Sequence, residues 1–221
     1  MSSNTFKPTK RSKVKRQHER GKYDHASVHA VLDSNPMCHI GYVIDGNPYV
    51  TPTLQWREGE RVYFHGSSAS RMLRTVREGV QVCLTVTNFD GFVLARSPMH
   101  HSLNYRSVMC FGTAHVVEGR EAKEAALKIM MEGLFPGRWD EVRGNSVQEM
   151  KATMVLAMDI EEASAKVRTG MPIDDDEDYD TVNSWNGVVP LVTTYGKAEP
   201  DPRNLPGVAT ITSTGLSSSR F

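Results

Sequence analysis

DGFVLARSPMHHSLNYRSVMCFG, residues 90–112, is the stretch around which the rest of the chain is organised. It is too polar for a plain core segment, and it contains too many histidines and aromatic residues for an idle loop. A polar cluster that leads directly into a strand is typical of a ligand site on a rigid scaffold. We therefore expect part of a site here, formed by Arg96, Ser97, His100, His101, Ser102, Asn104, Tyr105, Arg106 and Ser107.

Length and composition restrict the class of protein. The chain has 221 residues and a net charge of zero, so we expect one main domain and no strong attraction to nucleic acid. It has no apolar run of about 18 residues, and no apolar stretch follows the N-terminal charges, which argues against a membrane span or a secretory signal. The three scattered cysteines predict buried, reduced thiols in a cytoplasmic protein.

The domain boundaries are predicted from shifts in composition. Residues 1–22 form a basic arm, which we interpret as a solvated and partly disordered leader, although contact with nucleic acid or an anionic surface, or a transit signal, stays open. Residues 23–195 form the folded domain, and residues 196–221 form a loose tail rich in Gly, Pro and Ser.

Periodicity along the domain predicts a mainly β fold. A capped helix over 24–33, an amphipathic helix over 121–134 and a short helix over 146–151 are expected around the strands. Six strands, joined mostly by short turns, favour a sandwich or a small barrel. The predicted strands cover residues 37–44, 49–56, 61–65, 80–87, 107–117 and 153–161.

Two segments before the central stretch could contribute to the same site. Pro52 cannot donate to a β-ladder, so its strand must bulge or lie at an edge there, with Thr51 and Thr53 facing one side. HGSSASRM, residues 65–72, leaves a strand and enters a helix. Its serines and Arg71 could bind a phosphate, but an ordinary capped helix explains the segment about equally well.

Two late segments are less informative. The acidic run over 174–180 fits no EF-hand, and we interpret it as a solvated loop. WNGVVPL, residues 185–191, is a short apolar segment between polar segments. We expect the Trp185 side chain to be buried against another surface.

Metal and hydrolase chemistry are not expected. His100 and His101 are adjacent, so on a strand their side chains would point in opposite directions. None of the four candidate histidines, His39, His65, His100 and His101, has a His-x-x-x-His partner or a nearby pair of cysteines. No nucleophile elbow supports a Ser–His–acid triad. A phosphate-binding turn, a hydroxyl-lined strand and aromatic side chains instead suit a phosphorylated, flat, aromatic cofactor.

Several motifs resemble those of the pyridoxamine 5'-phosphate oxidase-like family, whose members have an FMN-binding split barrel. The similarity is strongest to its flavin-nucleotide-binding and nitroimidazole-resistance-like branch and covers roughly residues 16–200. HHSLNYRSV is its most specific motif. The other matching segments are ERGKYDHASVHAVLD, DGNPYVTPT, YFHGSSASRM, PGRW, ASAKVRTGMP and WNGVVPL.

The resemblance implies a six-stranded Greek-key split β-barrel with peripheral α-helices, and a homodimer with FMN at the subunit interface. It implies that the isoalloxazine ring lies beside residues 50–53 and that the phosphate and ribityl chain lie beside His65, Gly66, Ser70 and Arg71. Arg106 and Ser107 would approach the flavin from the neighbouring strand, and Trp185 would pack near its edge. The complete expected cofactor-binding set is Val50, Thr51, Pro52, Thr53, His65, Gly66, Ser70, Arg71, Asn104, Arg106, Ser107 and Trp185.

Three functions are compatible with this reading. The first is an FMN-dependent oxidoreductase acting on a small molecule, with His100 or His101 as a proton donor or substrate anchor. The second is a protein that binds flavin, or heme or deazaflavin, without turnover. The third is a structural dimer with a decayed site, which the presence of Ser70, Arg71, Arg106 and Ser107 argues against.

Overall fold

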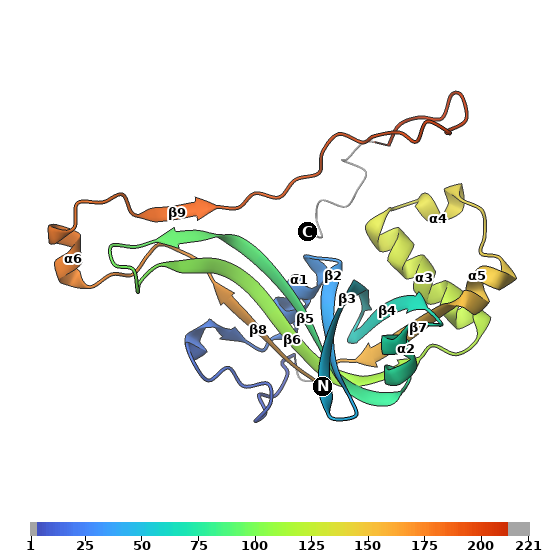
Figure 1. The fold of residues 1–221 in the computed structure, drawn as a ribbon, viewed down its shortest axis with the longest axis horizontal. Coiled ribbons are helices and arrows are strands. Elements are labelled where there is room, and N and C mark those ends of the chain that lie inside the picture. Colours follow the sequence, from blue (N-terminus) through green and yellow to red (C-terminus); the bar gives the residue numbers. More distant parts are fainter. Residues whose placement is uncertain (1–3, 212–221) are drawn as a thin grey trace.

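A ring of six antiparallel strands forms the centre of the molecule. In the computed structural model, which describes residues 4–211, the ring order is β6-β7-β4-β3-β2-β5, and pairing of β5 with β6 closes it (Figure 1). This confirms the predicted six-stranded split barrel. The ring strands are β2 (Met37–Ile44), β3 (Asn47–Glu58), β4 (Arg61–Ser67), β5 (Glu78–Leu94), β6 (Ser102–Val116) and β7 (Thr153–Asp159).

Alternating apolar side chains from each strand fill the barrel. Ile40, Phe64, Leu84 and Leu156 have no exposed surface, which is the largest stabilising contribution expected for a barrel of this kind. Cys38 and Cys110 are also completely buried, and burial raises the pKa of the Cys38 thiol to about 12. The prediction of buried, reduced thiols is confirmed for these two cysteines.

Helix α1 (His25–Asp33) packs against the barrel. The Asp24 side chain caps it by accepting a hydrogen bond from the backbone N–H of Ser27, as its sequence predicted. Val28, Val31 and Leu32 lie on one face and are buried in the core. Behind them, β8 (Glu162–Arg168) pairs with β6, and its small buried residues Ala163 and Ala165 belong to the same core.

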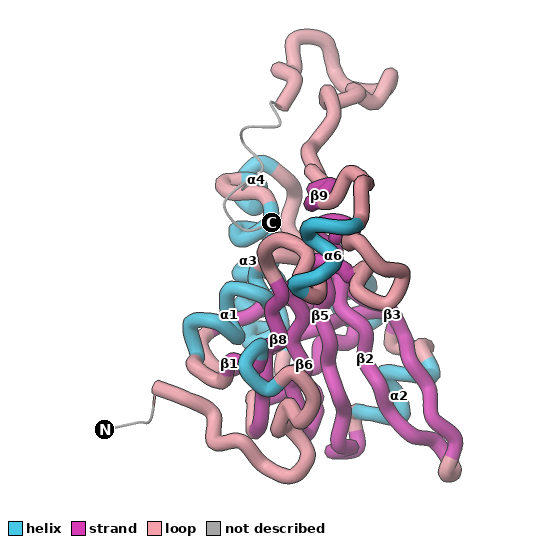
Figure 2. Tube along the Cα trace, turned by 90° about the vertical axis from the view of Figure 1, so that its left-hand side faces the viewer, coloured by secondary structure: helices cyan, strands magenta, loops and turns pink. Residues whose placement is uncertain are grey.

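Strands β5 and β6 continue past the barrel as one long hairpin, which Figure 1 shows reaching toward α6 (Asp176–Thr181). The sequence placed the start of β6 at residue 107 and the end of β5 at residue 87, so much of the expected polar loop is strand. Strand β9 (Gly187–Pro190) pairs with the outer end of β5, and Figure 2 shows β9 and α6 beside it. The hairpin is thus supported along its length by β8 and β9.

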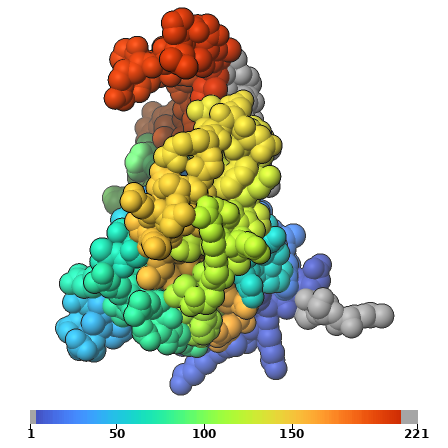
Figure 3. Space-filling view, turned by 90° about the vertical axis from the view of Figure 1, so that its right-hand side faces the viewer, coloured from blue at the N-terminus to red at the C-terminus, as the bar shows by residue number. Residues whose placement is uncertain are grey.

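A helical layer covers another side of the barrel. It consists of α3 (Arg120–Leu134), α4 (Arg138–Glu141) and α5 (Val147–Ala152), seen in yellow in Figure 3. Ala126 and Leu127 of α3 pack with Trp56, Tyr63 and Met150 in a second apolar cluster. The short helix α2 (Arg71–Val76) connects β4 to β5 and buries Leu73 in the main core.

The described part of the basic arm packs on the barrel and is not a free leader. Phe6 is buried in the core, and the backbone N–H of Phe6 donates to the carbonyl of Tyr23. Arg11 stacks on the ring of Phe111 and forms an ion pair with Glu162. The arm ends in the short η1 (His18–Arg20) and β1 (Gly21–Lys22), and β1 pairs with β8.

The acidic run over 174–180 differs from the solvated loop that was expected. The acidic run is mostly the helix α6, and the Asp174 side chain is completely buried. Residues 191–211 form an almost entirely exposed coil that runs back along the long axis of the molecule (Figure 1). The remainder of the predicted tail, 212–221, lies outside the described residues. None of the helices in residues 4–211 is long and apolar enough to cross a membrane.

Candidate functional site

Residues 50–53 lie at a free edge of β3. This strand pairs with β2 over its whole length up to Leu54, including Pro52 opposite His39, but it pairs with β4 only over residues 55–58. Proline is therefore tolerated because its missing N–H faces no partner strand on the other side. The sequence predicted a bulge or an edge at Pro52, and an edge is found. Val50 is 67% exposed, while Thr51 and Thr53 are half-buried on the opposite side of the strand.

The start of α2 lies next to this edge. Ser70 is the N-cap, and its Oγ accepts a hydrogen bond from the backbone N–H of Leu73. Arg71 follows, and its guanidinium lies 4.7 Å from the centre of the Tyr49 ring of β3. Gly66 allows β4 and α2 to come close, because a Cβ at this position would lie 3.1 Å from the Leu73 side chain. The contact of Arg71 with Tyr49 thus brings the start of α2 close to residues 50–53. We call the region formed by residues 50–53, Gly66, Ser70 and Arg71 the barrel edge, and its role in binding a cofactor stays a prediction.

Arg71 is the chemically available group at the barrel edge. Among residues 4–211, neither a carboxylate nor a carbonyl pairs with its exposed guanidinium, whose only recorded contact is the Tyr49 ring. A planar cation held on an aromatic ring, with two parallel donor directions free, suits a phosphate group. Tyr49 was not among the predicted site residues, although it directly precedes Val50.

His65 lies on the same strand as Gly66 but faces the helical layer. Its ring is half-buried and meets Trp56 edge-on, with 5.6 Å between the ring centres. Burial lowers the pKa of His65, so the ring is neutral at pH 7. Its buried Nδ1 and the buried Nε1 of Trp56 have no hydrogen-bond partner within the described chain. His65 contributes a neutral nitrogen and not a phosphate-binding charge.

The polar residues of β6 are largely occupied by their own chain. Arg106 forms a two-pronged ion pair with Asp90, which raises the pKa of the guanidinium. Buried Asn104 donates to the carbonyl of Gly170 and accepts from Arg168, and the Ser107 hydroxyl donates to the carbonyl of Lys166. Within a single chain these residues therefore stabilise the long hairpin through hydrogen bonds and an ion pair. Their contacts with a flavin stay predictions.

The hairpin tip, residues 95–101, is held by a buried carboxylate. Asp174 accepts from the backbone N–H of Arg96 at 2.8 Å and from its guanidinium at 3.1 Å. Burial alone would raise the pKa of Asp174, but these hydrogen bonds keep it below its ordinary value. The Nδ1 of His100 lies 3.5 Å from the same carboxylate, and the ring of Tyr179 stacks on Arg96. His100 is thus part of the support of the tip.

His101 points to a different environment. Its Nδ1 lies 2.8 Å from the carbonyl oxygen of Ser97, so Nδ1 carries the proton and donates, and Nε2 keeps a free lone pair. The ring borders a cavity of about 590 Å³ on the outside of the hairpin. The other walls of this cavity are almost wholly apolar: Phe92, Val93, Leu94, Ser102, Leu103 and Val189. We call this cavity the hairpin groove.

Trp185 is not buried in the single chain. It is 67% exposed and lies just before β9, in the segment that brings Val189 to the groove. Its expected burial is therefore wrong for one isolated subunit, because no described element packs over it.

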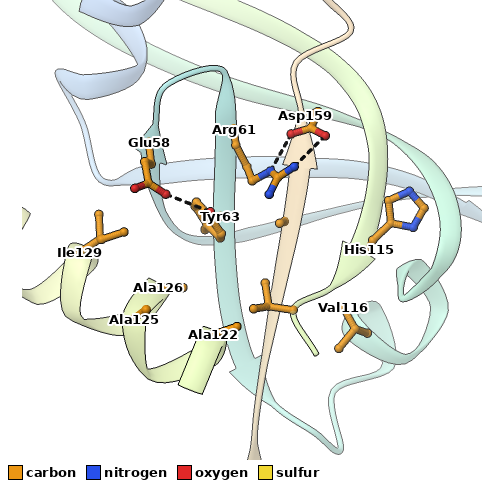
Figure 4. Close-up of a pocket in the computed structure, with 12 residues that line it drawn as sticks. Glu58, Arg61, Tyr63, His115, Val116, Ala122, Ala125, Ala126, Ile129 and Asp159 are labelled. Atoms are coloured by element: carbon orange, nitrogen blue, oxygen red, sulfur yellow. Dashed lines mark hydrogen bonds and ion pairs between the residues drawn. The ribbon is translucent and has the colours of Figure 1, made fainter. Parts of the chain in front are cut away.

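A further pocket of about 400 Å³ lies between α3 and the barrel (Figure 4). Ala122, Ala125 and Ala126 of α3 form one wall. On the opposite wall, Arg61 pairs with Asp159 and the Tyr63 hydroxyl donates to Glu58 (Figure 4). Because these polar groups satisfy one another, the pocket presents small apolar surfaces and little free charge to a ligand.

The predicted single site is thus divided into two regions within one chain. The barrel edge lies beside α2, whereas His100 and His101 lie at the far end of the long hairpin, next to α6 (Figure 1). Sequence reasoning missed Tyr49, Asp90 and Asp174, which position the predicted residues. Each lay in a segment that the sequence analysis quoted: Tyr49 in DGNPYVTPT, Asp90 at the start of the central stretch, and Asp174 in the acidic run that was interpreted as a solvated loop.

Comparison with solved structures shows close relatives of the whole chain. The flavocytochrome Anf3 from Azotobacter vinelandii is 44% identical, with a TM-score of 0.87 over 93% of this chain and 95% of that one. A FAD and heme binding protein from Mycobacterium smegmatis is 34% identical, with a TM-score of 0.83 over 88% and 95% of the two chains. A putative 5-nitroimidazole antibiotic resistance protein from Bacteroides thetaiotaomicron, at 23% identity, a TM-score of 0.55 and coverages of 65% and 84%, shares the fold.

The sequence comparison gives the same assignment. No curated protein matched the chain. The family model described as pyridoxamine 5'-phosphate oxidase matches residues 24–167, which extend from the cap of α1 to the end of β8. The chain belongs to the pyridoxamine 5'-phosphate oxidase-like family, as its motifs indicated.

Proposed function

We propose that this protein is a redox protein that binds one flavin and one heme per subunit, in two separate regions. The observation that carries the proposal is the 44% identity, along 93% of the chain, to a protein named as a flavocytochrome. The 34% identical protein is named for binding FAD and heme. The two regions of this chain differ in chemistry in the way that two such cofactors require.

The barrel edge fits the flavin. Arg71 has no competing anion in the described chain and rests on Tyr49, so its guanidinium is free to bind a phosphate of the cofactor. The exposed backbone edge at residues 50–53 would border the ring system. We propose FAD in place of the FMN expected from the sequence, because FAD is the flavin in the name of the 34% identical protein. Both nucleotides carry the phosphate that Arg71 would bind.

The hairpin groove fits the heme. A heme protein commonly supplies a neutral imidazole as axial ligand, with the other ring nitrogen held by a carbonyl or carboxylate. His101 has this arrangement, because the Ser97 carbonyl fixes Nδ1–H and leaves Nε2 free. Phe92, Leu94, Leu103 and Val189 provide apolar walls suited to a flat macrocycle.

A second copy of the chain would complete both regions. The outer faces of β2, β3, β5, β6 and β9 carry a row of exposed apolar side chains, more than a monomer usually leaves uncovered. An isologous pairing of these faces would also cover Trp185. The exposed apolar side chains are Met37, Val43, Val50, Phe92, Leu103, Met109 and Val189.

The chemistry follows from this division. When bound, the flavin supplies two-electron redox chemistry and the heme supplies one-electron chemistry. The chain holds each cofactor, excludes water from the groove with apolar walls, and keeps His101 in the tautomer that presents Nε2. The substrate is proposed to be a small redox-active molecule, which makes the protein an oxidoreductase.

A visible spectrum of the purified protein tests the proposal. We expect flavin bands near those of free flavin and an intense heme Soret band in the same fraction of a dimer, and FAD in the extract after acid release. A protein that retains neither chromophore after addition of FAD and hemin would overturn the proposal.

A further inference from the structure

Two histidines and a glutamate form a compact cluster away from both proposed cofactor regions. His25 and His29 lie one turn apart on α1, and Glu60 lies in the turn between β3 and β4. The His25 Nδ1 is 2.7 Å from one carboxylate oxygen of Glu60, and the His29 Nε2 is 3.1 Å from the other. The three potential ligand atoms all lie within 4.8 Å of one another.

The spacing of the histidines is the reason that they meet. Residues four apart on a helix lie on the same face, so both rings project to the same side of α1. From the sequence we predicted no metal site in the chain. Only His39, His65, His100 and His101 were considered, and this His-x-x-x-His spacing was overlooked.

The cluster is held rigidly. Asp24 caps α1, and the opposite face of the helix is buried in the core through Val28 and Leu32. The ring of His25 stacks on Phe6 of the N-terminal arm, with ring centres 4.2 Å apart and planes 13° apart. Because buried Phe6 is itself fixed by a backbone hydrogen bond to Tyr23, little side-chain freedom remains to be lost on binding.

The charges also suit a cation. Each carboxylate oxygen of Glu60 faces one imidazole nitrogen, that of His25 or that of His29, so the three side chains converge on one point. No Lys or Arg forms an ion pair with Glu60 in the described chain. The His100, Asp174 and Asp178 cluster differs on this point, because Arg96 already occupies the Asp174 carboxylate.

We propose that His25, His29 and Glu60 bind a divalent transition-metal ion of the Zn²⁺, Fe²⁺ or Co²⁺ class. Two imidazoles and one carboxylate are the ligand set of open three-residue sites, which leave the remaining positions to water. With metal–ligand bonds of about 2.0–2.2 Å, ligand atoms in a tetrahedral site lie about 3.3 Å apart. The cluster therefore needs shifts of only about 1–1.5 Å, within the reach of side-chain rotation. This proposal is independent of the flavin and heme.

Titration of the full-length protein, after chelation and dialysis, with Co²⁺ and then Zn²⁺ tests the proposal. We expect one equivalent of Co²⁺ to bind with visible d–d absorption and to be displaced by Zn²⁺, and we expect Zn²⁺ to raise the unfolding temperature. His29→Ala and Glu60→Gln should each weaken binding by at least about 100-fold. His18→Ala, which removes a highly exposed histidine outside the cluster, should bind as the wild type does.

Two results would overturn the proposal. The first is the absence of stoichiometric Co²⁺ or Zn²⁺ binding by the wild type, which would mean that the three groups form only a hydrogen-bonded link between α1 and the turn. The second is unchanged binding in both His29→Ala and Glu60→Gln, which would place the metal elsewhere. Circular dichroism of the variants shows whether the fold is kept. Glu60→Gln preserves the size of the side chain, so it still tests the proposal if His29→Ala fails to fold.

Discussion

The barrel edge and the hairpin tip differ in whether their charged side chains are paired. At the barrel edge no carboxylate of residues 4–211 pairs with Arg71, and its guanidinium lies on the ring of Tyr49. At the tip Arg96 and Asp174 form an ion pair, and the group left free is the imidazole of His101 beside apolar walls. This difference is the reason that we propose a phosphate-bearing cofactor for the first region and a flat macrocycle for the second.

The two regions also differ in how they are supported. The barrel edge belongs to a closed ring of strands with a completely buried core. The tip stands outside the ring and depends on β9, β8 and the Asp174 contacts. Local opening should therefore be easier at the tip than at the barrel edge, since fewer buried apolar contacts hold it. Substitutions in one region should leave the other intact.

The largest effect is expected for His101→Ala. If His101 holds the heme as we propose, its loss should weaken heme binding by at least about 100-fold, equivalent to about 2.7 kcal/mol or more. The Soret band should disappear during purification while the flavin bands stay. His100→Ala is the matched control, because the His100 ring faces Asp174 and not the groove. If His101→Ala kept its heme and His65→Ala lost it, the heme ligand would be His65, the half-buried histidine of β4, and not His101.

The next effect is expected for Arg71→Ala. Loss of a charge-assisted phosphate contact should weaken flavin binding by about 1.5–3 kcal/mol, with heme content unchanged. Fluorescence titration of the deflavinated protein with FAD measures this. Arg77→Ala is the control, because Arg77 follows the same helix but pairs with Glu78. Equal FAD affinity in Arg71→Ala and the wild type would contradict the phosphate assignment.

A smaller effect, on heme binding alone, is expected for Gly91→Ala. A Cβ at this residue, whose φ is +150°, would lie 2.5 Å from the carbonyl oxygen of Val189, so β9 must shift and one wall of the groove moves with it. Heme affinity should fall by about tenfold, measured by hemin titration, with FAD affinity unchanged. Gly119→Ala has a similarly positive φ but open space around it, and it separates the clash from backbone strain. Normal hemin affinity in Gly91→Ala would show that β9 is not a wall.

The smallest effect is a loosening of the tip by acid. The pKa of Asp174 is lower in the folded protein than its ordinary 3.8, so its stabilising contribution is present above about pH 4 and is lost as the pH falls through the folded value. Amide hydrogen exchange in residues 95–101 should accelerate more between pH 5 and pH 3 than in β3, after correction for intrinsic rates. Asp174→Asn should remove this difference, and an unchanged pH response would show that Asp174 does not hold the tip.

The barrel was predictable because its strands alternate strongly and its turns have clear chemistry. Asp24, Ser70 and Ser146 cap helices that the sequence predicted at nearly the observed bounds. β8 was not expected, since alanine has a low strand propensity, yet Ala163 and Ala165 of this strand are buried in the main core. The outer part of the long hairpin was predicted to be a loop because it is rich in polar residues. In the structure these residues pair within the chain, as Arg106 does with Asp90.

The site was less predictable because spacing along a chain does not give distance in space. Residues 50–53, Ser70 and Arg71 came together because short connections join their strands and helix. His100 and His101 were separated from them by the length of a hairpin that was expected to be short. The exposure of Trp185 was not predicted, because an apolar segment indicates that a side chain needs cover but not which surface covers it.

The most direct test of two separate cofactor regions is the visible spectrum of Arg71→Ala and His101→Ala, measured side by side with flavin and heme quantified per subunit. The account predicts a crossed pattern, in which Arg71→Ala loses flavin and keeps heme while His101→Ala loses heme and keeps flavin. If each variant lost both cofactors while staying folded, the two regions would form one shared site, and the division proposed here would be wrong.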